Sequence, residues 1–70
     1  MQTDNTNILN RIIVKHGEKQ KLAELFGHSM PFIRQSLLGE RNTLEALKIR
    51  KVAIERGGFE VVPKQILFKN

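Results

Sequence analysis

Arg34 and Gln35 are adjacent side chains with distinctive hydrogen-bonding chemistry in this 70-residue chain. A guanidinium can donate two parallel hydrogen bonds to guanine O6 and N7, and a carboxamide can form a bidentate pair with adenine. If Ile33 points into the core from a helix, both residues lie toward the solvent face of that helix. The same face would carry Ser29, Met30 and Pro31. This set predicts contact with base edges in a DNA groove, and the alternative is an ordinary solvated helix face.

Cationic and polar residues flank this helix at the places where other helices should begin. Unpaired backbone N–H groups at a helix N-terminus attract phosphate oxygens, and Lys or Arg side chains add charge to them. The expected phosphate contacts are Lys19, Gln20 and Lys21 on one side and Arg41, Asn42 and Thr43 on the other. For any single member, Lys21 in particular, the competing interpretation is ordinary surface charge.

A pair of short helices must present this face, and residues 19–38 have the spacing for one. Ala23 is small where two helix axes approach, and Gly27, four residues later, can adopt the left-handed conformation that ends a helix. Ile33 follows after six residues and closes the pair. The expected apolar contacts are Leu22, Leu25 and Phe26 from the first helix and Phe32, Ile33, Leu37 and Leu38 from the second. The pattern predicts helices over about 18–26 and 29–38.

The segment LAELFGHSMPFIRQSLLG resembles the helix-turn-helix of phage repressor and Cro proteins and of the lac repressor family. In those families a small residue, a turn glycine and a β-branched residue recur at the same intervals. Ser36 departs from the common pattern, which has a larger apolar residue there, although the lac-type variant tolerates a small one. The resemblance covers the middle third of the chain. It implies a mainly α, four-helix domain that binds double-stranded DNA with helix 29–38 in the major groove.

One further helix is expected before this pair and one after it. Helical spacing of apolar residues predicts a first helix from Asp4 or Asn5 to about His16, ended by Gly17. Its apolar face would consist of Ile8, Leu9, Ile12 and Ile13. The run IIVKH is β-branched enough to form a strand instead, but the spacing and the resemblance both favour a helix.

Within the central pair, Ser29 should cap the second helix, Pro31 fits its first turn, and Gly39 should end it. A last helix should begin after Asn42 or Thr43 and run to Arg56. Its expected apolar face consists of Ala46, Leu47, Ile49, Ala53 and Ile54. Arg50 falls within that face. We expect its stem to lie along the core edge with the guanidinium in solvent, the alternative being a pair with a carboxylate or a phosphate.

Composition limits the remaining possibilities. The formal net charge of +5 favours a polyanionic partner. Without cysteine, neither a disulfide framework nor a thiolate metal site is expected, and two histidines are too few for a histidine-only metal site. We find no catalytic motif, cofactor signature, signal peptide or membrane-spanning run, and the chain leaves no room for a separate ligand domain. The expectation is a cytoplasmic DNA-binding protein that is not an enzyme.

The last twelve residues form a distinct segment in this interpretation. Residues 1–58 are expected to form the DNA-binding domain and residues 59–70 an extended arm of one or two short strands. Its large apolar residues, which should pair with a second copy in a homodimer, are Phe59, Val61, Val62, Ile66, Leu67 and Phe68. In the alternative function, the chain is an antitoxin-like or adaptor module whose arm adds a strand to a different protein.

Overall fold

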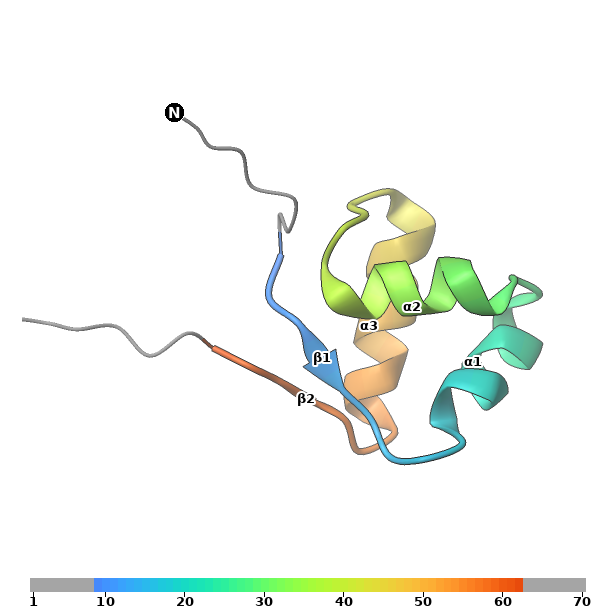
Figure 1. Ribbon diagram of the computed structural model, residues 1–70, viewed down its shortest axis with the longest axis horizontal. Helices are drawn as coiled ribbons and strands as arrows, with labels where there is room; N and C mark the ends of the chain where they lie inside the picture. The colour runs from blue at the N-terminus through green and yellow to red at the C-terminus, as the bar shows by residue number, and fades with distance from the viewer. Residues whose placement is uncertain (1–8, 63–70) are drawn as a thin grey trace, which may run out of the picture.

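The computed structural model describes residues 9–62, in which three helices pack beside a short antiparallel strand pair (Figure 1). The elements follow in the order β1 (Ile12–Ile13), α1 (Glu18–Phe26), α2 (Met30–Leu38), α3 (Leu44–Glu55) and β2 (Phe59–Glu60). α2 crosses in front of α3 in Figure 1, and the strands lie on the other side of α3 from α1. The mainly helical class is therefore as expected, with three helices in this part of the chain rather than four.

The predicted first helix is wrong over the residues that the structure describes. Ile12 and Ile13 form β1, and they pair antiparallel with Glu60 and Phe59 of β2, respectively. β-branched side chains suit a strand, and the partner strand lies almost fifty residues away, so local spacing carries no signal for the pairing. Ile12 is still a core residue, as expected from its apolar side chain, although it reaches the core from a strand and not from a helix. The expected positions 4–8 lie outside the described residues.

The other three helices are confirmed within one or two residues of the expected bounds, and their caps explain why. Ser29 Oγ accepts a hydrogen bond from the Phe32 amide at 3.4 Å, which starts α2. Thr43, rather than Asn42, caps α3, because its Oγ1 accepts from the Ala46 amide at 3.2 Å. Gly27 ends α1 in the left-handed conformation, with its amide bonded to the Ala23 carbonyl at 2.8 Å. The turn between α1 and α2 thus has the expected glycine geometry.

The core is small and lies where the three helices meet β1. Its buried members are Ile12, Leu22, Ile33, Leu37, Ile49 and Ala53, with Val14, Ala23, Phe26, Phe32 and Val52 packed against them. Ser36 is also fully buried, and its hydroxyl donates to the Phe32 carbonyl at 2.8 Å. The carbonyl of this small, buried residue also accepts a hydrogen bond from Arg50 of α3, so α2 and α3 are in direct contact at Ser36.

Three residues expected on apolar faces are instead exposed. Leu25 is 60% exposed, because α1 packs on the core through Leu22, Ala23 and Phe26, and Leu25 lies at the edge of that stripe. Leu47 and Ile54 are about two-fifths exposed on the side of α3 that faces away from the core. A helix in so small a domain buries a narrow stripe, so spacing alone overestimates the apolar face.

The guanidinium of Arg50 is buried, whereas the sequence led us to expect it in solvent. Its side chain is 8% exposed, and its guanidinium donates to the Ser36 carbonyl at 2.9 Å and to the Asn10 carbonyl. No carboxylate within residues 9–62 forms an ion pair with it. Burial lowers the pKa of Arg50 from its ordinary value, while the charge of Glu60 opposes that shift. The residue joins α3 to the end of α2 and to the segment before β1.

Candidate nucleic-acid interface

The exposed face of α2 carries the side chains expected to contact bases. Met30, Pro31 and Arg34 are exposed, whereas Ile33 and Leu37 point into the core. The register assumed from Ile33 is therefore confirmed. Ser29 is exposed as well, but its hydroxyl accepts the capping hydrogen bond, so its first role is to hold the N-terminus of α2.

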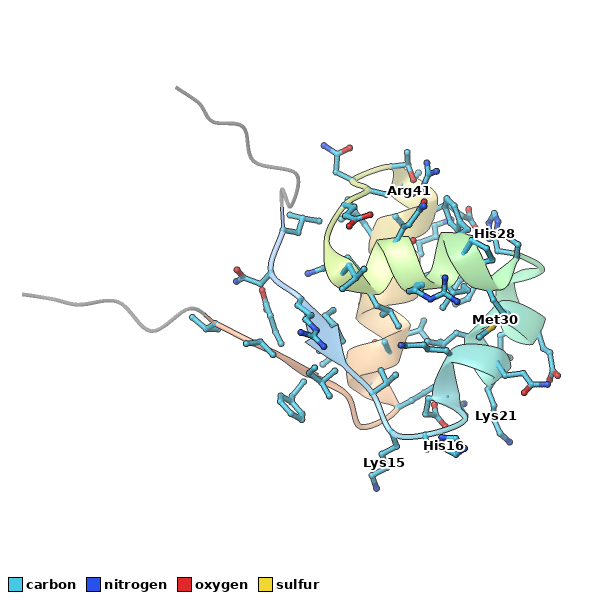
Figure 2. The ribbon with its side chains drawn as sticks, viewed as in Figure 1. Lys15, His16, Lys21, His28, Met30 and Arg41 are labelled. Atoms are coloured by element: carbon cyan, nitrogen blue, oxygen red, sulfur yellow. The ribbon has the colours of Figure 1, made fainter. Side chains whose placement is uncertain are left out.

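The start of α1 lies against the start of α2 and forms a shared hollow with it. Residues of the loop before α1, of its first turn and of α2 line a hollow of about 310 Å³; they are Val14, Lys15, His16, Gly17, Lys19, Gln20 and Met30. Two expected phosphate contacts, Lys19 and Gln20, are thus brought next to the expected base contact Met30. Lys21 is exposed further round the same helix (Figure 2).

Arg41 lies at the opposite edge of α2 and is engaged with the protein. Its Nε donates to Gln35 Oε1 at 2.7 Å, and its guanidinium lies over the Phe32 ring, 5.1 Å from the centroid. His28 stacks on the same ring at a centroid distance of 4.3 Å and places its Nε2 3.3 Å from Glu45 Oε2. Phe32 packs against the core, as favoured from the sequence. This cluster holds the α2–α3 connection against α2.

The contact with Arg41 changes what Gln35 can offer. Gln35 is half-buried, and its carboxamide oxygen already accepts a hydrogen bond. A bidentate pair with adenine uses both the oxygen and the nitrogen of the amide. While the Arg41 bond is kept, the orientation of the carboxamide is set by Arg41, and the NH₂ group of Gln35 can donate to an acceptor such as guanine O6 or thymine O4. Thr43 is likewise committed through its capping hydroxyl.

Cationic groups flank α2 on both sides. Figure 2 shows Arg41 above this helix and Lys15, His16 and Lys21 below it. No Asp or Glu occurs between residues 9 and 17 or between 27 and 39. Among the described acidic residues, Glu18 pairs with Arg56 at 2.7 Å, and that hydrogen bond holds the pKa of Glu18 below its ordinary value. Within these two ranges, which include α2 and the segment before α1, Arg and Lys are therefore not offset by carboxylates.

Sequence reasoning missed Arg11, Lys15 and His16 as members of this surface. The predicted helix over residues 5–16 placed them on an unrelated solvent face, whereas the strand and loop bring them beside α1. A signal was available: basic residues recur at 11, 15 and 19, with Glu18 as the one acidic residue among them. Such a run, directly before a helix pair, indicates a common electrostatic surface.

The expected dimer residues lie on a different part of the molecule. Phe59, Val61 and Val62 are 60%, 41% and 69% exposed, while their backbone folds back on the domain: Phe59 pairs with Ile13, and the Val61 amide donates to the Arg11 carbonyl at 2.8 Å. Ile66, Leu67 and Phe68 lie outside the described residues.

Metal and membrane sites were also considered. No group of three or more His, Cys, Asp or Glu residues in the range 9–62 could hold a metal ion. No helix in the same range is long and apolar enough to span a membrane.

The chain was compared with known proteins in three ways. Comparison with family models, with curated proteins and with solved structures gives no match to this chain. The residues and their geometry are the basis on which a function can be assigned.

Proposed function

We propose that this chain is a sequence-specific, double-stranded DNA-binding regulator of the repressor or Cro type, with α2 in the major groove. The observation that carries the proposal is the exposed face of α2, which presents Arg34 and Met30, with Arg41 at one edge and with Lys15 and Lys19 in the hollow beside Met30 at the other. A major groove is bordered by two phosphate strands, and an α-helix fits between them. A helix flanked by positive charge on both sides matches that arrangement.

The side chains divide into two roles in this proposal. Arg34 donates to a guanine, Gln35 donates through its amide nitrogen, and Met30 or Pro31 contacts a thymine methyl group. Lys19, Gln20, Lys21, Arg41, Asn42 and Thr43 contact phosphates and position the helix. A good bidentate contact contributes about 1–3 kcal/mol of discrimination against the wrong base.

A homodimer is part of the proposal, because one helix contacts too few base pairs for useful specificity. The exposed Phe59, Val61 and Val62 are the surface offered to a second copy. Sedimentation at tens of micromolar should give a dimer for the intact chain and a monomer for Phe59→Ser. The matched control is Leu25→Ser, an equally exposed residue on α1 that should leave the dimer intact. A monomeric intact chain would favour the alternative, an interaction module that binds a different protein.

Binding to a preferred duplex and to random duplex DNA tests the assignment of roles. Arg34→Ala should weaken binding to the preferred site by about tenfold or more, since 1.4 kcal/mol corresponds to a factor of ten, and should change random-DNA binding far less. Lys51→Ala, which removes one exposed charge from α3, is the control and should affect both DNAs slightly. An equal loss on both DNAs for Arg34→Ala would show that Arg34 contacts phosphate instead.

A further inference from the structure

Arg11, Lys19 and Arg34 come from three different elements and line one recess. Arg11 directly precedes β1, Lys19 lies in the first turn of α1, and Arg34 lies in the middle of α2. The recess has a volume of about 180 Å³. Its apolar walls include Val14, Leu37 and Leu38. We refer to this feature as the cationic recess.

The charge of the cationic recess is not balanced by the protein. None of its lining residues is acidic, and no carboxylate within residues 9–62 forms an ion pair with Arg11, Lys19 or Arg34. Other arginines behave differently, since Arg50 donates to backbone carbonyls and Arg56 to Glu18. Three like charges around one apolar-walled hollow repel one another and raise the local potential, so an anion that enters is strongly favoured.

The position of the recess identifies the kind of anion. It adjoins α2 at Arg34, the residue proposed to contact a base, so an anion held there lies at the edge of the groove that α2 occupies. Arg11 is fixed in place, because its carbonyl accepts from the Val61 amide at 2.8 Å and β1 is paired with β2. The backbone from which the Arg11 side chain extends is therefore held in a fixed position beside the recess.

We propose that the cationic recess binds one phosphodiester group of the DNA backbone, held by Arg11 and Lys19, next to the base contacted by Arg34. This inference rests on the proposed function and extends it. The strand pair becomes part of the DNA-binding surface, and Arg11 sets the position of α2 in the groove. Arg34 forms the wall between the phosphate and the base.

The salt dependence of duplex binding tests the recess. Neutralising one phosphate contributes about 0.9 to the slope of log affinity against log salt. Arg11→Ala should therefore reduce the slope by up to about 0.9 per protomer, because Lys19 still faces the same phosphate. Relative to the intact protein, the loss of affinity per protomer should be up to about eightfold greater at 0.1 M salt than at 1 M salt. The loss should be equal on preferred and random DNA. Lys51→Ala is the charge-matched control and should leave the slope unchanged, and melting curves check that both variants fold.

A neutral phosphate analogue then locates the contact. Replacing single phosphates of the preferred duplex by uncharged methylphosphonates should identify a position whose loss weakens the intact protein more than it weakens Arg11→Ala, in which Lys19 is the one remaining cationic contact to that phosphate. Free inorganic phosphate at millimolar concentration, added as a competitor, should not displace the duplex; displacement would indicate a site for small anions. An unchanged slope for Arg11→Ala, with duplex binding intact, overturns the recess assignment. Absence of duplex binding by the unmodified protein overturns the proposed function itself.

Discussion

Replacing Arg50 by methionine should strongly destabilise the fold, although methionine is apolar and of similar length. The guanidinium bridges the Ser36 carbonyl, at 2.9 Å, and the Asn10 carbonyl from a position that is 8% exposed. Substituting an apolar residue for a buried charge is often harmless when its charged partner is removed too. Here the partners are the backbone carbonyls of Ser36 and Asn10, which no side-chain substitution removes. In Arg50→Met both carbonyls therefore lose the hydrogen bond from the guanidinium.

The expected cost follows from counting those carbonyls. The Ser36 carbonyl keeps the Gly39 amide as a partner at 3.2 Å, whereas the Asn10 carbonyl loses its donor. A hydrogen bond from a charged group contributes about 1.5–3 kcal/mol, and leaving the half-buried Asn10 carbonyl without this donor adds less than the roughly 1–3 kcal/mol of a fully buried acceptor. We estimate a loss of about 2–4 kcal/mol, partly offset by the relief of guanidinium desolvation. Domains have about 0.05–0.15 kcal/mol of stability per residue, so this is a large share of the total.

Thermal unfolding followed by circular dichroism measures the effect. At about 4–8 °C per kcal/mol for a domain of this size, the melting temperature should fall by roughly 10–30 °C. Lys51→Met, an exposed position on the same helix, should change it by only a few degrees. An Arg50→Met variant that melts within a few degrees of the unmodified protein would refute the bridging role and imply that solvent or another donor reaches both carbonyls.

Three further outcomes are expected. Gly39→Ala should abolish cooperative melting, because φ is +90° at this residue and an added Cβ would collide with the Leu9 carbonyl. Gly27→Ala is the comparison: φ is +69° but the space around it is open, so the substitution should lower the free energy of unfolding by only about 1–2 kcal/mol. Ala23→Leu should lower stability by about 1–3 kcal/mol through overpacking between α1 and α2, as seen by urea unfolding. Pairing with Arg56 lowers the pKa of Glu18, so the ionised carboxylate stabilises the fold above about pH 4.5, and this contribution is lost as pH falls through the lowered pKa. Glu18→Gln should therefore reduce the dependence of the unfolding free energy on pH in the acid range.

Local signals explain why the three helices could be predicted from the sequence. Ser29, Thr43 and Gly39 act within one helical turn of the residues whose backbone they satisfy, so the caps are visible in the sequence. The exposed face of α2 followed in the same way from Ile33 pointing inward. Predictions of this kind need no knowledge of distant segments.

The features that the sequence did not predict depend on distant partners. β1 pairs with a strand at residues 59–60, and Arg50 takes the carbonyl of Asn10, forty positions away. The cationic recess combines residues from β1, α1 and α2, so Arg11 could not be placed in it while residues 9–16 were expected to be helical. Pairing between remote segments is specified by the whole fold, which explains why these interactions were not found from spacing.

Selection of bound sequences from a pool of random duplex DNA tests the central claim most directly. The proposal predicts enrichment of a two-fold symmetric consensus whose half-sites lie about 10–10.5 base pairs apart, or a multiple of that. It also predicts that the same selection with Arg34→Ala loses preference at one base pair in each half-site and keeps the rest. A pool that shows no enrichment over the input with the unmodified protein would contradict the assignment of this chain as a sequence-specific DNA-binding protein.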